Sequence, residues 1–179
     1  PTGDQIVSVG AHRTAAYEPG RGREIWHVNY RDGFSNVPRP VFGHGMVYIA
    51  TGFNEPSIMA VRVDGRGNVT DSHVAWTVSR GAPFTPSPLL VDDLLYFISD
   101  IGIASAVDAR TGETRWQQRI GGNHSASPIF AAGRIYFQSE EGTTTVIAPG
   151  AVFTQLARSQ LDGGTLASIA VSGRAFFIR

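Results

Sequence analysis

The sequence predicts an all-β fold, a β-propeller built from four-stranded antiparallel blades. Two independent series of markers support this prediction. One series is aromatic and recurs at intervals of 48, 40 and 40 residues: Tyr48, Tyr96, Tyr136 and Phe176. The other is tryptophan and recurs at intervals of 50 and 40 residues: Trp26, Trp76 and Trp116. A shared period of about 40 residues is typical of a propeller blade.

The sequence around each aromatic marker is also repeated. Residues 86–97 read Pro-Ser-Pro-Leu-Leu-Val-Asp-Asp-Leu-Leu-Tyr-Phe, and similar segments occur at residues 38–49, 126–137 and 166–177. Each segment contains two short apolar runs separated by a turn sequence, which indicates a β-hairpin. We therefore expect every unit to begin with two strands.

The third and fourth strands of a unit are clearest after residue 104. Residues 105–108, Ser-Ala-Val-Asp, form a third run, and residues 109–113 form a turn that leads to a strand containing Trp116. Thr111-Gly112 supplies the positive-φ position that a hairpin turn needs. A twisted four-stranded sheet cannot bury both of its faces alone, so neighbouring blades must stack. We expect the tryptophans to fill the gaps between them.

The repeats divide the chain into one partial propeller of about four blades. The expected units are residues 1–34, 35–80, 81–120, 121–160 and 161–179: the back of one blade, three full blades and the front of another. The second unit is longer, which we assign to an insertion at residues 64–72. In the fourth unit Phe153 lies near the expected tryptophan position. The chain begins and ends inside patterned sequence, so we expect it to be an excerpt of a longer protein.

The composition excludes several classes of function. The formal net charge is zero and the 15 basic residues, all arginine, are scattered, which argues against a nucleic-acid partner. The chain has no cysteine, so it forms no disulfide, thiolate zinc site or cysteine nucleophile. No apolar run approaches the roughly 18 residues that span a membrane.

One segment carries a resemblance to a known family. Residues 106–116, Ala-Val-Asp-Ala-Arg-Thr-Gly-Glu-Thr-Arg-Trp, resemble the blade signature of the pyrroloquinoline-quinone-like propeller repeat family, and residues 16–26 resemble it more loosely. The resemblance implies a propeller of seven or eight blades in a periplasmic or otherwise extracytoplasmic protein. We therefore expect further blades of the same protein to complete the ring.

Members of this family suggest three functions. The first is a non-catalytic binding or scaffold propeller that mediates protein–protein assembly, similar in repeat style to lipoproteins that assist outer-membrane barrel assembly. The second is part of a dehydrogenase that uses pyrroloquinoline quinone with calcium. The third is a sensor domain fused to a kinase or secretion module. One fold hosts many functions, so the repeats alone do not choose between them.

The dehydrogenase alternative finds little support in the residues. Such enzymes use an adjacent cysteine pair and a calcium site of Glu, Asn and Asp, and this chain has no cysteine. Turns and blade-end hydrogen bonds explain Asp100, Asp108 and Glu140. The histidines do not occur at metal-ligand spacings. We assign no catalytic, cofactor-binding or metal residue, and we expect no cofactor.

A binding site in a propeller is expected where loops enter the first strand of each blade. Those segments are residues 36–39, 84–87, 123–127 and 165–168. Arg39 and His124 are the polar side chains that stand out there, and Asn36 and Asn123 accompany them. We list these four as candidate funnel-facing residues, with a protein as the expected partner at the funnel or rim.

Overall fold

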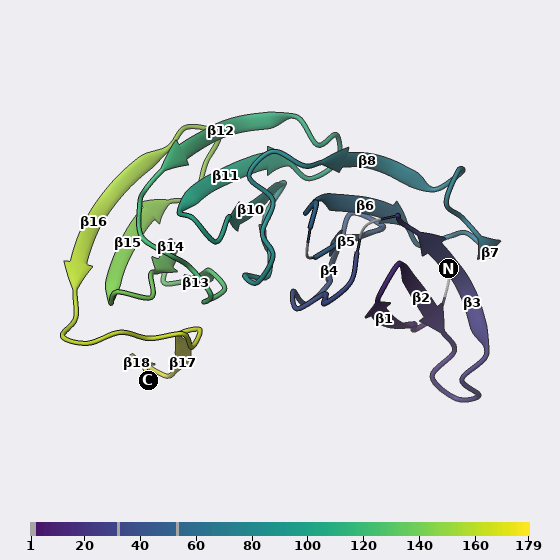
Figure 1. The fold of residues 1–179 in the computed structure, drawn as a ribbon, viewed down its shortest axis with the longest axis horizontal. Coiled ribbons are helices and arrows are strands. Elements are labelled where there is room, and N and C mark those ends of the chain that lie inside the picture. The colour runs from purple at the N-terminus through teal and green to yellow at the C-terminus, as the bar shows by residue number, and fades with distance from the viewer. Residues whose placement is uncertain (1–2, 32, 53) are drawn as a thin grey trace.

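In the computed structural model, the described residues are 3–31, 33–52 and 54–179, and their regular elements are all β-strands. The strands form five sheets that follow one another along an open arc, with the two ends of the chain at its two ends (Figure 1). The predicted all-β propeller fold is confirmed. No helix in the described ranges is long and apolar enough to cross a membrane.

Three sheets are complete antiparallel blades in which the strands follow chain order. We call their strands inner, second, third and outer. The second sheet has β4 (Val41–Gly43), β5 (Met46–Ala50), β6 (Ile58–Arg62) and β8 (Val74–Val78). The third has β9 (Leu89–Val91), β10 (Leu94–Ile98), β11 (Ile103–Asp108) and β12 (Thr114–Arg119). The fourth has β13 (Ile129–Ala131), β14 (Arg134–Gln138), β15 (Thr143–Ala148) and β16 (Thr154–Gln160).

The first and last sheets are partial blades. The last has only β17 (Ala170–Ser172) and β18 (Ala175–Phe177), an inner and a second strand. The first has β1 (Ile6–Gly10), β2 (Arg13–Tyr17) and β3 (Glu24–Asn29). Its fourth strand, β7 (Gly67–Asn68), comes from the second blade and pairs parallel to β3. The prediction of antiparallel blades is therefore wrong for this one pair.

The register explains the two series of sequence markers. In the third sheet Tyr96 pairs with Ala106, and Ala106 pairs with Trp116. The second sheet repeats this row with Tyr48, Ala60 and Trp76. A β-bulge follows the middle residue of the row in each blade, and it bends the strand where the large indole must be accommodated.

The core consists of apolar clusters between neighbouring sheets. The cluster between the second and third sheets contains Tyr48 and Ile58 from one side and Leu95 and Phe97 from the other, all fully buried. Similar clusters join the first sheet to the second and the third to the fourth. Each blade therefore buries its faces against its neighbours, as expected for a repeat fold.

The tryptophans link each blade to the next, as the sequence predicts. Trp76 Nε1 donates a hydrogen bond to the Ala109 carbonyl oxygen of the third blade at 3.1 Å. Trp116 Nε1 donates to the Gly150 carbonyl oxygen of the fourth blade at 3.0 Å. In both cases the acceptor lies in the turn between the third and outer strands.

The insertion in the second blade covers the first tryptophan. Residues 64–72 extend back to the first sheet, where β7 pairs beside Trp26 and Val69 packs into the same cluster. This insertion does not account for all of the extra length. Tyr48 and Ala60 are 12 residues apart, whereas Tyr96 and Ala106 are 10 apart, so the connection between β5 and β6 is also longer.

The fourth blade departs from the row at its outer strand. Val146 pairs with Ala157, so an alanine occupies the tryptophan position. The expectation that Phe153 stands near that position is wrong. Phe153 lies in the preceding turn and packs edge-on against Trp116, with ring centroids 5.1 Å apart. It therefore belongs to the contact with the third blade, not to a contact with the next.

The two equivalent tyrosines differ in their hydrogen bonds. Tyr96 Oη accepts the Gly150 N–H at 2.7 Å. By the 40-residue repeat, the residue that corresponds to Gly150 beside Tyr48 is Arg110. The Arg110 N–H donates to Asp108 Oδ1 and not to Tyr48. Tyr48 Oη is buried without a hydrogen-bond partner among the described residues, and burial raises the pKa of Tyr48 to about 12.

This difference predicts that replacing tyrosine by phenylalanine has different effects on stability at the two positions. Tyr96→Phe should lower the free energy of unfolding by about 1 kcal/mol, because it removes a buried hydrogen bond. Tyr48→Phe should leave the free energy unchanged or raise it, because the lost hydroxyl has no partner. Urea unfolding followed by tryptophan fluorescence measures both. Equal losses in the two variants would contradict this account.

Gly112 should be far less replaceable than another glycine of the same conformation. It has φ +75°, and a Cβ there would lie 2.7 Å from the Trp76 ring. Gly112→Ala should therefore cost about 3 kcal/mol of unfolding free energy through strain and overlap. Gly133 has φ +72° with open space around it, so Gly133→Ala should cost only about 1 kcal/mol. Thermal unfolding of both variants checks the difference.

Candidate functional site

The four candidate residues lie at one end of the blades, which we call the loop face. It consists of the connections between outer and inner strands and those between second and third strands. The structure places Asn123 and His124 together before β13, and Asn36 and Arg39 together before β4. Among the described residues, no hydrogen bond joins one pair to the other.

Asn123 and the His124 ring make hydrogen bonds within their own blade. The Asn123 N–H donates to the Glu141 carboxylate at 3.1 Å, and this contact holds the Glu141 pKa below its usual range. His124 is only 2% exposed. Its Nδ1 lies 3.0 Å from the Gln138 carbonyl oxygen and its Nε2 lies 3.0 Å from that of Gly121. His124 therefore holds the loop in place and presents no free ring nitrogen to a ligand.

Asn36 braces the contact between the first two blades. Its Nδ2 donates to the Gly10 carbonyl oxygen at 2.7 Å and to Tyr30 Oη at 3.0 Å. Gly52 approaches it so closely that a Cβ there would lie 2.1 Å from Asn36 Oδ1. This packing gives Asn36 a structural place behind the loop face.

Arg39 interrupts a regular series of serine contacts. The Arg39 N–H donates to Ser87 Oγ, the Ser87 N–H to Ser127 Oγ, and the Ser127 N–H to Ser168 Oγ, each at 2.9 Å. These four residues occupy the same position before successive inner strands. Only the first is not serine. Its side chain is exposed, and none of the described residues hydrogen-bonds or ion-pairs with its guanidinium group.

The sequence did not predict a pocket that lies beside the connection from β5 to β6. Seven residues separate these strands, whereas four separate β10 from β11 and β14 from β15. The ends of the connection are fixed, because the Thr51 N–H donates to the Ser57 carbonyl oxygen and the two hydroxyls lie 2.9 Å apart. The sequence signal for this longer connection is the spacing between Tyr48 and Ala60, which exceeds the spacing between Tyr96 and Ala106 by two residues.

This pocket has a volume of about 480 Å³ and a mostly polar lining. Tyr30 and Arg31 contribute from the loop after β3, and Glu55 and Pro56 from the 51–57 connection. Arg31 and Glu55 are exposed, and within the described part of the chain neither side chain has an ion-pair partner. Two exposed charges of opposite sign beside a connection whose ends are fixed suit a polar protein surface.

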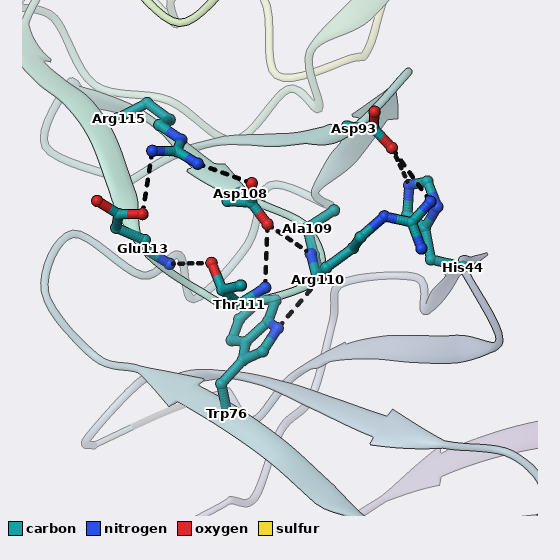
Figure 2. Close-up of polar contacts among 9 residues, drawn as sticks. All are labelled: His44, Trp76, Asp93, Asp108, Ala109, Arg110, Thr111, Glu113 and Arg115. Atoms are coloured by element: carbon teal, nitrogen blue, oxygen red, sulfur yellow. Dashed lines mark hydrogen bonds and ion pairs between the residues drawn. The ribbon is translucent and has the colours of Figure 1, made fainter.

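The opposite end of the blades, the turn face, carries the signature motif (Figure 2). Asp108 accepts the N–H groups of Arg110 and Thr111 at 3.0 Å and ion-pairs with Arg115 at 2.9 Å. The Arg115 guanidinium holds the Asp108 pKa below its usual range, with help from the two N–H donors. The carbonyl of Ala109 in the same turn receives the Trp76 indole.

A second contact on this face joins the same two blades. His44 Nε2 lies 3.0 Å from the Asp92 carbonyl oxygen and 3.5 Å from Asp93 Oδ1, and Arg110 reaches the same carboxylate oxygen (Figure 2). The polar residues of the signature thus bond within the third blade, and His44 and the Trp76 indole join that blade to the second.

A calcium–quinone site does not fit these residues. Among the described residues, no three His, Asp or Glu side chains come together as a metal site. Asp100 Oδ2 accepts the Phe84 N–H at 2.7 Å, and Glu140 accepts the Ser125 hydroxyl at 2.5 Å. Asp100 and Glu140 are therefore engaged in loop contacts.

Comparisons with known proteins agree with the repeat seen in the strands. A family model described as outer membrane protein assembly factor BamB matches residues 63–150. The chain carries pyrroloquinoline-quinone-like propeller repeats. Among curated proteins, the BamB of Legionella pneumophila (strain Paris) is 25% identical over 98% of this chain, and the tetrathionate hydrolase of Acidianus ambivalens is 24% identical over 68%.

Solved structures with this repeat fold extend the comparison. BamB from Moraxella catarrhalis matches 96% of the chain with a TM-score of 0.72 at 17% identity. The computationally designed Ika8 protein matches 97% with 0.75 at 10% identity, and a europium-containing methanol dehydrogenase matches 87% with 0.67 at 10% identity. These likenesses show the fold alone.

The chain spans less than half of the curated relatives. It covers 46% of the Legionella protein and 28% of the Acidianus protein. It covers 50% of the Moraxella chain and 52% of the designed one. The matching proteins therefore contain further sequence beyond the part that resembles this chain.

The Asp108 contacts predict a pH dependence. A carboxylate whose folded pKa is depressed stabilises the fold above its unfolded pKa, near 4, and loses this effect as the pH falls through the folded pKa. Asp108→Asn should therefore melt lower than the parent at pH 7 and lose less stability between pH 6 and pH 3. Thermal melts across this range measure the effect. Asp71→Asn, at an exposed position without a described ion pair, is the control and should follow the parent chain.

Proposed function

We propose that this chain is part of a non-catalytic propeller that binds protein partners and supports outer-membrane protein assembly outside the cytoplasm. The match of residues 63–150 to the model of an outer membrane protein assembly factor supports the assembly role. The Legionella relative, which aligns with nearly the whole chain, carries the same name.

The loop face provides the observation that carries the binding role. The 51–57 connection is the place where the loop face departs from the tight turns of the next two blades. Its fixed ends limit the ordering cost of binding, and preorganisation of this kind raises affinity. Arg31 and Tyr30 beside it are residue types that dominate binding energy at protein interfaces.

The polar contacts of the turn face argue for placing the partner on the loop face. Asp108, Arg110 and His44 are already engaged between blades or within the signature turn. Arg31, Glu55 and Arg39 lie at the other end of the strands and are exposed. Charged groups at an interface rim set the rate and specificity of association.

A pull-down from outer-membrane extract tests this function. The tagged chain should enrich components of the barrel-assembly machinery. Replacing residues 51–57 by the four-residue turn of residues 99–102 should lower their recovery at least tenfold, which corresponds to about 1.4 kcal/mol. Arg66→Ala, an exposed arginine on the turn face, is the matched control and should bind normally.

A titration with pyrroloquinoline quinone and calcium separates binding from catalysis. We expect no saturable quenching of tryptophan fluorescence and no dye-linked alcohol oxidation. Saturable quenching together with turnover would overturn the non-catalytic proposal. Equal recovery of partners by the parent chain and the 51–57 variant would remove the loop face from the binding surface.

A further inference from the structure

Both ring nitrogens of His124 face carbonyl oxygens. Nδ1 lies 3.0 Å from the Gln138 oxygen, and Nε2 lies 3.0 Å from the Gly121 oxygen. A neutral imidazole has one N–H donor and one acceptor, whereas an imidazolium donates from both nitrogens. In either neutral tautomer, one ring lone pair would face a carbonyl lone pair in a site where the residue is only 2% exposed. The observed pair of contacts therefore fits the imidazolium.

The charged groups around this loop also favour a positive ring. They come from three neighbouring elements: Asp100 from the 99–102 connection, Glu140 and Glu141 from the 139–142 connection, and Arg158 from β16. The Asn123 N–H does most to lower the pKa of Glu141, and the charge of His124 adds to the effect. Three carboxylates and one guanidinium thus surround the loop, and nearby opposite charge favours the charged form of a titratable group.

The carbonyl that faces Nε2 belongs to a peptide bond between two glycines. Gly121 has φ +81° and Gly122 has φ +76°. Glycine adopts φ of either sign at little cost, so this peptide can turn over. The residue packed against it is also glycine, because a Cβ at Gly102 would lie 2.6 Å from the Gly121 oxygen. The segment can therefore present either the Gly121 oxygen or the Gly122 N–H to the ring.

The next connection between blades has a similar backbone without a titratable ring. Thr165 takes the place of His124, since the N–H groups of both donate at 2.9 Å to carbonyl oxygens in the preceding second-to-third connections. By the same alignment Gly163, with φ +93°, takes the place of Gly122. Threonine does not titrate near neutral pH, so this connection is an internal control for any effect of the ring.

We propose that His124 and the peptide between Gly121 and Gly122 form a pH-sensitive switch in the loop face. At low pH the imidazolium donates from Nε2 to the Gly121 oxygen and from Nδ1 to the Gln138 oxygen. As the pH rises, the Nε2 proton passes to water, and the peptide turns so that the Gly122 N–H donates to the free Nε2 lone pair. Histidine is the side chain that ordinarily changes charge between pH 5 and 8, so the loop beside Asn123 has two forms across that range.

Amide exchange of Gly122 in the full-length protein tests the switch. The Gly122 N–H has no hydrogen-bond partner among the described residues, so at pH 5 it should exchange near its intrinsic rate. At pH 8 its protection factor should be at least tenfold higher, because the N–H then donates to Nε2. Gly163 should show no such rise. NMR measurement of exchange with water reports both amides.

A variant that copies the next connection removes the ring and keeps the fold. His124→Thr should fold, because Thr165 occupies the equivalent place in the same repeat, and circular dichroism checks this. In this variant Gly122 should remain unprotected at both pH values. His73→Gln, at a histidine on the turn face, is the control and should keep the pH dependence of Gly122 seen in the parent protein.

Nitrogen-15 spectra of the histidine rings give a second measurement on the parent protein. The signals that disappear in His124→Thr should show two N–H groups at pH 5 and only the Nδ1–H at pH 8. A single ring N–H at pH 5, or an equal rise of Gly122 protection in His124→Thr, would overturn the proposal. So would Gly122 protection that stays constant between the two pH values. The partner pull-down is a separate measurement, so this inference and the proposed function can fail independently.

Discussion

The contact between the tryptophan of one blade and the turn of the next is the constraint on which this structure depends. The indole needs a small residue beside it in the third strand, which Ala60 and Ala106 supply, and a bulge that bends the strand beside it. It also needs a close backbone approach, which Gly112 permits. The spacing between Trp76 and Trp116 follows, because each of them must reach a carbonyl in the following unit.

This constraint gives the two ends of the blades different tolerance of sequence variation. On the turn face, Trp76 and His44 join the second blade to the third, and Asp108 and Arg115 fix the turn within the third blade. The 64–72 insertion, although long, serves the same purpose by covering Trp26. On the loop face, the 51–57 connection can vary without disturbing an indole. Variation in loops on a rigid scaffold is a common basis of binding.

The repeat made most of the fold predictable from the sequence, whereas the environment of single side chains was not. Two marker series with one period fixed the strands and the role of Trp76 and Trp116. The alanine at position 157 was missed because the paired residues Val146 and Ala157 are 11 positions apart, whereas Ala106 and Trp116 are 10 apart. His124 was read as a funnel residue, but its surroundings come from carbonyls in a turn and in a strand that the repeat does not identify. The parallel pairing of β7 depends on a contact across blades, which no local pattern encodes.

The serine contacts before the inner strands give the arc a direction. Each backbone N–H donates to the serine of the next blade, so every contact has a donor blade and an acceptor blade. Ser87 and Ser127 both give and receive, which lets a duplicated unit enter between existing ones without new chemistry. Arg39 donates its N–H to Ser87, but its side chain has no acceptor, so the series of serine contacts ends at this position.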